Sequence, residues 1–433
     1  MVPAPKKIIP SAVAVLARVF LAALFLVVSA LHAAELRPPV VIIPGAPGTE
    51  LADATSGKLL WPNAWLMTIR GGTDCLALPL DNPESTSVVT GGLVRAVSVA
   101  GMKFPVRVYG GLEKKLKALG YQAGDWNAPT GEGEYFYFPY DWRQSVETSG
   151  RRLSVTLSEL YRKSPPGTPP AIVLGHSLGG LVARYALMYG DAALGETGPL
   201  PPVTWSGRTQ IGTLFLVATP NEGTFIALKR LEKGIYYSGH RGAFSRETLF
   251  SFPSVFDVIP GTLPPLVDGE GRDLPFRLDD PDDWERVGWS IIDEGDDAPT
   301  IPRDAIRAHL VRELTRSARL RTALDQHAST PNPATVYGVA GLSRSVQRTA
   351  LVTKKKGKMK VRFDPPPGTR ALLKPLLFEQ GDSMVAARSL AAEGSSHDPT
   401  SSLCFTRVVH SKRSHHALLS SPEMLAALVE VLK

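Results

Sequence analysis

The stretch that decides the fold runs from Ala171 to Tyr185 and reads AIVLGHSLGGLVARY. Its first four residues are apolar and partly β-branched, which is typical of a buried strand. The spacing of apolar residues from 181 to 188 favours a helix. Between them lies GHSLGG, residues 175 to 180. In a chain with 39 glycines a G-x-S-x-G match alone means little, but a strand, a sharp turn and a helix in this order predict a serine raised at the apex of the turn.

The residues of this turn suit a nucleophile. A side chain at position 175 or 179 would crowd a turn held in a strained backbone conformation, so glycine fits both positions. The helix that follows begins with free amide donors and the positive end of its dipole, which favour negative charge developing near the serine. We therefore predict that Ser177 is the nucleophile of an acyl-transfer reaction.

Outward from this turn, the chain alternates short β-branched or aromatic runs with helical patterns. The expected strands are residues 39–43, 135–138, 171–174, 214–217 and 335–339, and the expected helices are residues 112–119, 153–162, 181–188 and 423–432. Such alternation predicts a mostly parallel sheet covered by helices on both faces. Combined with the serine turn, it favours the α/β-hydrolase fold.

A serine nucleophile needs a base to take its proton and a carboxylate to orient that base. In this fold the acid and then the base follow the serine along the chain. Asp382 lies in the tight turn GDSMV, and His415 lies in a loop just before the last helix. We predict that Asp382 is the acid and His415 is the base. The alternatives that remain open are Asp364 for the acid and His416, His410 and His397 for the base.

An acyl-transfer site also needs donors for the oxyanion. One should be the backbone N–H of Leu178, directly after the nucleophile, and the second should come from the loop after the first strand. In that loop Pro47 has no N–H, so Ala46 is the candidate. Each such donor typically contributes about 3 kcal/mol to transition-state stabilisation.

The pattern of residues 1 to 34 indicates that the protein is exported. Two lysines precede an apolar stretch over residues 11–31 that ends in small residues, which is the layout of a secretory signal. The stretch is also long enough to span a bilayer as an uncleaved anchor, so a periplasmic or secreted protein and a membrane-anchored one both remain open. In an oxidising compartment Cys75 and Cys404 could form one bridge or stay free.

Residues 223 to 333 interrupt the alternating pattern with aromatic, proline and acidic residues. We predict that they form a cap over the active edge of the sheet, inserted between two core parts, residues 35–222 and 334–433. The acidic run at 279–283 lacks the spaced ligands and glycine of an EF-hand, so a solvated turn is expected. The sequence contains no Walker loop and no Cys/His ligand cluster, so neither a cofactor nor a metal is expected.

The formal net charge of +7 comes partly from the run KKKGKMK at 354–360. No aromatic stacking pattern or binding motif accompanies this run, which argues against a nucleic-acid partner. We expect a solvated loop, with attraction to anionic lipid headgroups as the alternative.

Several segments, in order along the chain, resemble the lecithin:cholesterol acyltransferase family, which includes the phospholipid:diacylglycerol acyltransferases and lysosomal-type phospholipases. They are PVVIIPGAPGTEL (39–51), FPYDWR (138–143), LGHSLGGLVARY (174–185), VATPNEGT (217–224), FPSVFDVIP (252–260), GDSMV (381–385) and the segment around His415. The resemblance extends from residue 39 to the end of the chain.

This resemblance implies acyl transfer on lipid esters. It implies Ser177, Asp382 and His415 as the triad, with the N–H groups of Ala46 and Leu178 as oxyanion donors. It also implies a lid at about residues 55–80 that contacts lipid, and a buried structural pair formed by Asp141 and Arg143.

Three functions therefore stand as hypotheses. The first is a lipid O-acyltransferase or phospholipase whose partner is a lipid ester at a membrane or lipid surface. The second is an exported carboxylesterase or triacylglycerol lipase that uses only water. The third, a hydrolase-fold binding protein without activity, is disfavoured because nucleophile, acid and base are all present.

Overall fold

A computed structural model describes residues 36–69, 71–99, 102–105, 108–238, 241–261, 266–292, 301–355, 358–392 and 398–433. The predicted export segment and His397 lie outside these residues. Within the described ranges, no helix is both long enough and apolar enough to cross a bilayer.

A parallel sheet forms the centre of the molecule, with the order β18-β13-β10-β9-β1-β8-β7. Its strands are β1 (Val40–Ile43), β7 (Gln122–Ala123), β8 (Glu134–Tyr137), β9 (Ala171–His176), β10 (Ile211–Val217), β13 (Thr335–Gly341) and β18 (Arg407–Ser411). The five predicted strands are confirmed, and β7 and β18 are added at the two edges. Strand β9, which leads to Ser177, is buried along its whole length near the middle of the sheet.

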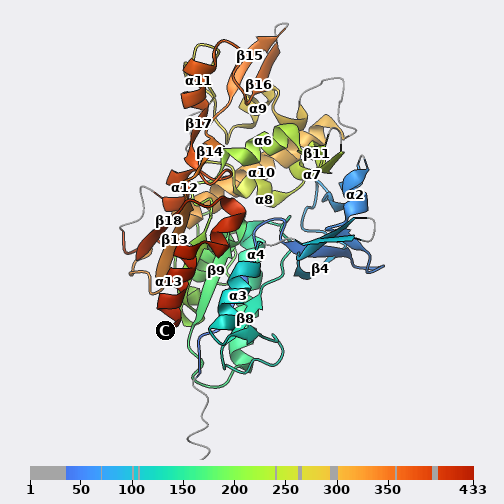
Figure 1. Cartoon of the computed structure of the whole chain (residues 1–433). Helices are drawn as coiled ribbons and strands as arrows, with labels where there is room; N and C mark the ends of the chain where they lie inside the picture. The colour runs from blue at the N-terminus through green and yellow to red at the C-terminus, as the bar shows by residue number, and fades with distance from the viewer. Residues whose placement is uncertain are drawn as a thin grey trace, which may run out of the picture.

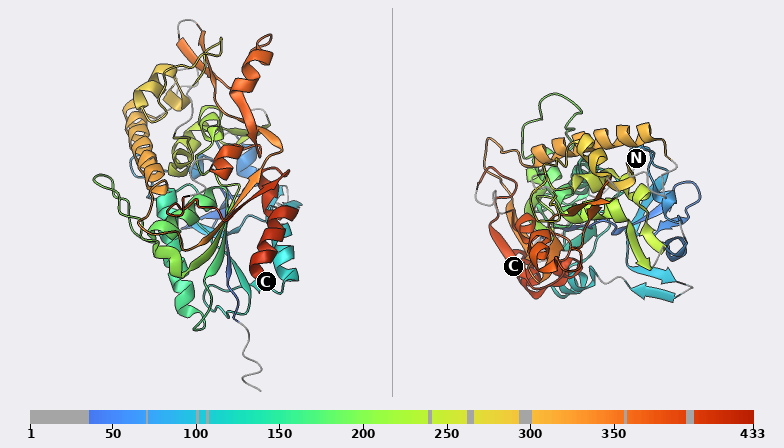
Figure 2. Two further views of the ribbon diagram at one scale, coloured as in Figure 1. Left: turned by 90° about the vertical axis from the view of Figure 1, so that its left-hand side faces the viewer. Right: turned by 90° about the horizontal axis from the view of Figure 1, so that it is seen from above.

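Helices cover both faces of the sheet, as predicted (Figure 2). Helices α3 (Gly110–Ala118) and α13 (Pro422–Leu432) lie on one face, and α4 (Val146–Lys163) and α5 (Leu178–Tyr189) lie on the other. Alternate side chains of β1 pack on the two faces of the sheet, because successive residues of a strand point to opposite faces. Val40 and Ile42 pack in the cluster with α3 and α13, whereas Val41 and Ile43 pack in the cluster with α4 and α5.

Local signals explain where two of these helices begin. The side chain of Ser145 accepts the N–H of Thr148 and caps α4, and Glu147 in the first turn suits the positive end of the helix dipole. At α13, Ser421 is the cap and Pro422 takes the first helical position, where its missing N–H costs nothing.

The predicted cap lies above the carboxyl edge of the sheet (Figure 1). It contains α6 (Phe225–Lys233), β11 (Ile235–Ser238), β12 (Arg241–Phe244), α7 (Arg246–Phe250), α8 (Pro253–Asp257), α9 (Pro281–Val287) and α10 (Arg303–Leu324). Trp284 and Trp289 are fully buried with ring centroids 5.7 Å apart. The aromatic residues of this segment belong to the same hydrophobic cluster as β1, α4 and α5, so the segment is packed onto the core of the sheet.

A second segment, between β13 and β18 in the chain, packs against the cap (Figure 1). It contains β14 (Arg344–Gln347), β15 (Leu351–Lys355), β16 (Lys358–Arg362), α11 (Arg370–Leu377) and β17 (Phe378–Gly381). Leu351 packs with Val267 of the cap and with α11. The sequence analysis places these residues in the second core part, residues 334–433, and the structure shows part of them packed against the cap.

The prediction of a loop at the lysine run is wrong. Strands β15 (Leu351–Lys355) and β16 (Lys358–Arg362) pair antiparallel, with Val352 opposite Val361. Both valines are buried and pack against the main core cluster, so they anchor a hairpin that the lysines alone would not indicate.

The remaining elements of the described residues are short strands, short helices and 3₁₀ turns. They are β2 (Thr49–Asp53), β3 (Leu59–Trp61), α2 (Ala64–Thr68), β4 (Val88–Leu93), β5 (Ala96–Val99), β6 (Met102–Pro105), α12 (Ala387–Ala391) and the 3₁₀ turns η1 (Asp74–Leu76), η2 (Ser206–Thr209), η3 (Ser290–Ile292) and η4 (His415–Ser420). Cys75 and Cys404 are both free thiols, Cys75 being exposed.

Candidate active site

Ser177 stands at the apex of the turn between β9 and α5, with φ 53° and ψ −124°. This left-handed conformation is strained for a residue with a side chain, and the Ser177 N–H stabilises it by donating to the Val217 carbonyl at 2.8 Å. The packing around the turn is tight enough to require glycine. A Cβ on Gly175 would lie 2.5 Å from the Cα of Gly180, and one on Gly45 would lie 2.8 Å from the Cβ of Ser177.

The structure brings Ser177, His415 and Asp382 together in one chain of hydrogen bonds. The Ser177 Oγ lies 3.0 Å from His415 Nε2, and His415 Nδ1 lies 2.7 Å from Asp382 Oδ2. The carboxylate only accepts, so Nδ1–H donates to it and Nε2 is left to accept the serine hydroxyl. This tautomer is the one a general base requires.

The loops that carry Asp382 and His415 hold both side chains in place. The second oxygen of the buried Asp382 accepts the N–H groups of Met384 at 2.9 Å and Val385 at 2.8 Å. The His415 N–H donates to the Asp382 carbonyl at 2.9 Å, so the acid and the base are also joined through the backbone. Leu418, a residue of η4, is fully buried and anchors the loop of the base.

The alternative acid and bases lie elsewhere. Asp364 is exposed after β16, and His410 is exposed on the edge strand β18. His416 is exposed, and its ring lies 5.3 Å from the ring of His415. Protein packed around part of this ring, together with the charges of His415 and Arg230, lowers the pKa of His416 to about 4. His416 is therefore neutral at ordinary pH.

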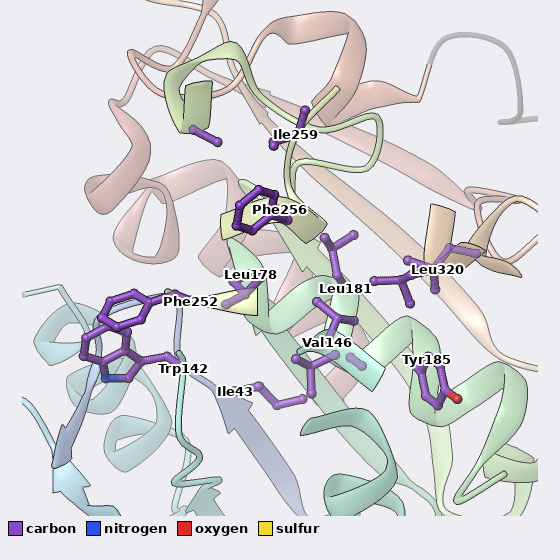
Figure 3. Close-up of a cluster of buried hydrophobic side chains, with 14 of the residues drawn as sticks. Ile43, Trp142, Val146, Leu178, Leu181, Tyr185, Phe252, Phe256, Ile259 and Leu320 are labelled. Carbon is purple, nitrogen blue, oxygen red and sulfur yellow. The ribbon is translucent and has the colours of Figure 1, made fainter. Parts of the chain in front are cut away.

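A largely apolar pocket opens above Ser177. Ala46 and Leu178, the predicted oxyanion residues, both line it beside the nucleophile. Its other wall residues are Pro47, Trp142, Pro220, Thr224, Ile226, Ala227, Arg230, Ile235, Phe244, Leu249, Phe252, Ser254, Val255, Val258, Met384, Val385 and His415. Figure 3 shows Phe252 from the cap against Trp142, with Leu178 beside them, and the two rings meet edge to face at 5.8 Å.

A buried relay links the oxyanion loop to the loop of the base. The Gly45 N–H donates to the Tyr109 hydroxyl oxygen at 3.1 Å, and that hydroxyl lies 3.3 Å from His176 Nδ1. His176 Nε2 lies 3.3 Å from the carbonyl oxygen of His415. Since a carbonyl oxygen only accepts, Nε2 carries the proton of His176 and Nδ1 accepts from Tyr109.

His176 stays neutral in this relay. Burial, followed by the charges of His415 and His416, holds the pKa of His176 well below its ordinary value. Because the His176 ring is neutral and has one tautomer, its contacts with Tyr109 and the His415 carbonyl keep a fixed direction. These contacts connect the loop of Ala46 to the loop of His415.

The sequence did not assign a role to three residues of this site. Tyr109 immediately precedes α3, far from any motif, and its contact depends on how that helix packs. His176 belongs to the serine motif, but the motif does not say what its ring touches. Arg230 lies in the last turn of α6, and its only local signal is a cation one turn after the apolar residues Ile226 and Ala227.

The structure confirms Asp141 and Arg143 as a buried structural pair. Arg143 Nη2 and Nε contact the two carboxylate oxygens of Asp141 at 2.7 Å and 2.9 Å. The same guanidinium donates to the Leu76 carbonyl and the Thr86 hydroxyl, each at 2.7 Å. It therefore fixes the end of the predicted lid to the core.

The lid segment also contacts the cap. The ring of Trp61 lies 5.0 Å from that of Phe244 on β12, and the Thr248 hydroxyl of α7 donates to Asp74 at 2.7 Å. Trp65 on α2 leaves 72% of its surface exposed. The acidic run at 279–283 caps α9 and forms its first turn, and its carboxylates form ion pairs, among them Asp282 with Arg307 at 2.7 Å.

No family model matches the chain. Among curated proteins, the chain is 30% identical over 164 residues to the uncharacterized protein YJR098C of Saccharomyces cerevisiae. That match covers 35% of this chain and 21% of the relative, so the chain spans about a fifth of the relative's length.

Among solved structures, the chain is similar to the crystal structure of the Tle4–Tli4 complex, with a TM-score of 0.54 and 14% sequence identity over 91% of this chain and 98% of that chain. The mature form of the Bacillus licheniformis lipase BlEst2 matches at a TM-score of 0.35 and 11% identity, over 93% of this chain and 94% of the lipase. Taken with the parallel sheet and the serine turn at the end of β9, the first of these similarities shows that the chain has the α/β-hydrolase fold.

Proposed function

We propose that this protein is a serine-dependent lipid acyl hydrolase with the capacity for O-acyl transfer. The observation that carries the proposal is the 3.0 Å contact between Ser177 Oγ and His415 Nε2 at the base of an apolar pocket. A nucleophile, an oriented base and a chamber for an apolar chain are the three features that acyl chemistry on lipid esters requires. An inactive binding protein would have no need of this alignment.

In the proposed reaction each of these residues carries out one step. Ser177 Oγ attacks the ester carbonyl carbon while its proton passes to His415 Nε2, and the oxyanion that forms accepts the N–H groups of Ala46 and Leu178. The imidazolium, held by Asp382, then gives that proton to the leaving alcohol oxygen as the C–O bond breaks. The products of this half-reaction are an alcohol and an acyl group bonded to Ser177.

The second half-reaction releases the acyl group. His415 takes a proton from water or from an acceptor alcohol, whose oxygen attacks the acyl carbon. Water yields a carboxylic acid, an alcohol yields a new ester, and in both cases the proton returns to Ser177.

The lining of the pocket supports an acyl chain as the occupant. Phe244, Leu249, Phe252, Val255 and Val258 from the cap contribute apolar surface next to the nucleophile. Each buried methylene of a bound chain contributes about 0.8 kcal/mol. A bound acyl chain therefore gains binding free energy from each methylene that it buries against these side chains.

Transfer to an alcohol is the second candidate because the segments that resemble lecithin:cholesterol acyltransferases run through the whole core. The same resemblance supports a lid that meets lipid at about residues 55–80. We further propose, from the N-terminal sequence, that the protein is exported and meets its substrate at a membrane surface.

The test uses purified protein lacking residues 1 to 34 and a phospholipid with a labelled acyl chain in vesicles, with and without a sterol or diacylglycerol. Labelled fatty acid in both arms would support hydrolysis, and labelled new ester in the acceptor arm would support transfer. Release of no labelled product from the phospholipid, from a triacylglycerol or from a short-chain ester would contradict the proposal.

The relay through Tyr109 gives a separate prediction. Tyr109→Phe is expected to lower kcat about tenfold with little change in KM, because Gly45 loses its acceptor and His176 loses the partner that fixes its ring. The effect should be smaller than the roughly 10²- to 10³-fold loss that follows removal of an oxyanion donor itself. Steady-state kinetics on a chromogenic ester measures it.

Tyr121→Phe is the matched control, because this buried tyrosine donates to the Pro38 carbonyl at 3.1 Å at the far end of β1. Its kcat should equal that of the unmodified protein. Equal losses in the two variants would show that Tyr109 acts only through general stability.

A further inference from the structure

Thr224 stands directly before α6, the first helix of the cap. Its hydroxyl oxygen accepts the N–H of Ile226 at 3.2 Å and so caps the helix. Its backbone N–H donates to the carbonyl of Val258, at the end of α8, at 2.7 Å. The preceding residue, Gly223, packs so closely that a Cβ there would lie 2.7 Å from the backbone of Pro260. Thr224 is therefore fixed to the cap through both its side chain and its backbone.

The same hydroxyl contacts the turn that carries the acid. It donates to the Met384 carbonyl, while the Met384 N–H donates to Asp382 Oδ1 at 2.9 Å. A threonine hydroxyl has one hydrogen and a carbonyl oxygen only accepts, so the direction of the contact is fixed. Met384 is thus held by the cap through its carbonyl and by the acid through its N–H. A displacement of Met384 would move one of the two N–H groups that orient Asp382.

The turn of the acid is strained and needs contacts from outside. Ser383 has φ 91°, in the left-handed region that favours glycine, and such a turn persists only if its neighbours hold it. One of these contacts comes from the loop of the base, where the His415 N–H donates to the Asp382 carbonyl at 2.9 Å. The Thr224 hydroxyl is a second such contact, and it comes from the cap.

The junction between core and cap does not depend on this hydroxyl alone. Ser389 on α12 accepts the Glu222 N–H at 3.0 Å and donates to the Gly223 carbonyl at 2.8 Å. These bonds hold the backbone just before Thr224. Removal of the Thr224 hydroxyl should therefore release the turn of the acid without detaching the cap from the core.

We propose that Thr224 is a positioning residue of the acyl-transfer reaction, and that it holds the turn of Asp382 in place from the cap. This inference rests on the proposed function. A base works well only while its partners keep it within about 0.5 Å of the productive geometry, so a looser turn slows proton transfer more than it weakens ester binding. Thr224, Ile226 and Met384 all line the pocket, so the contact lies where a bound ester meets the cap.

The experiment measures kcat and KM on a chromogenic ester, together with the rate at which a small fluorophosphonate labels Ser177. Thr224→Val keeps the shape of the side chain and removes the hydroxyl. We expect kcat to fall about tenfold or more while KM changes less than about threefold, because the lost contact acts on the chemical step. The labelling rate should fall by a similar factor. Thr224→Ser keeps the hydroxyl and should restore kcat to within about threefold of the unmodified protein.

Two further variants separate this role from stability. Ser145→Ala removes the side-chain cap of a different helix, α4, and should lower the melting temperature without lowering kcat. Thr224→Asp decides the case in which Thr224→Val does not fold. Its carboxylate caps α6 but has no hydrogen to donate to the Met384 carbonyl, so kcat should fall in this variant as well.

Ordinary kcat in Thr224→Val or in Thr224→Asp would overturn the inference. A loss in Thr224→Ser as large as that in Thr224→Val would also overturn it, because it indicates packing of the methyl group and not the hydroxyl contact. An equal loss in Ser145→Ala would overturn it as an effect of stability. If the unmodified protein cleaves no ester and takes up no fluorophosphonate, the proposed function fails instead.

Discussion

Ser177→Ala is expected to lower kcat by about 10⁵-fold or more while leaving the protein folded. Alanine removes the oxygen that forms the acyl bond, and neither His415 nor the oxyanion donors can replace it. The residual rate should come only from binding and the N–H donors that remain. Hydrolysis of a chromogenic ester measures the loss.

The fold should survive because the serine side chain accounts for little of the packing at the turn. The backbone contact from Ser177 N–H to the Val217 carbonyl is unaffected by the change. Thermal unfolding of the variant should therefore match that of the unmodified protein. A variant that keeps ordinary activity, at an unchanged melting temperature, would show that another residue attacks the ester.

His415→Ala is expected to lower kcat by about 10⁴-fold or more, and His416→Ala by less than about tenfold. Among the histidines that the structure describes, only His415 reaches both Ser177 Oγ, at 3.0 Å, and the Asp382 carboxylate, at 2.7 Å. The two neighbouring histidines form a matched pair, since each substitution removes one imidazole from the same loop. Kinetics of both variants on one ester separates them.

Two results would reverse this assignment. The first is retention of activity in His415→Ala, and the second is a loss in His416→Ala as large as that expected for His415→Ala. Loss of activity in both variants with a lowered melting temperature would indicate that the substitutions disrupt the structure of the loop. Circular dichroism of each variant distinguishes that case.

The central strands could be predicted because they are buried on both faces and so read as unbroken apolar runs. Strand β18 lacked that signal. As an edge strand it exposes Arg407 and His410, and its short apolar run carries too little information alone. The two-residue strand β7 has exposed side chains and no pattern at all.

The lysine hairpin shows a different limit. Its strands β15 and β16 place Val352 and Val361 opposite each other, and both valines belong to the main core cluster. The local charge of the sequence favoured a solvated loop, but the burial of the two valines against residues far away in the chain favours the hairpin.

The candidate triad could be predicted because each member lies in a local pattern with a chemical reason. Ser177 follows a strand in a glycine turn, Asp382 lies in a tight turn, and His415 precedes a helix. Tyr109 and Arg230 have no such pattern. Tyr109 contacts the loop of Gly45, and Arg230 lies on a cap helix that lines the pocket, so both positions depend on tertiary structure.

The most direct measurement is labelling with a fluorophosphonate, followed by mass spectrometry of the peptides. A fluorophosphonate reacts with an activated serine and mimics the tetrahedral intermediate. We predict one equivalent of label per chain, carried by Ser177, and none on Ser177→Ala or His415→Ala. Label on a different residue, or ester hydrolysis by a protein that takes up no label, would contradict the assignment of Ser177 as the nucleophile.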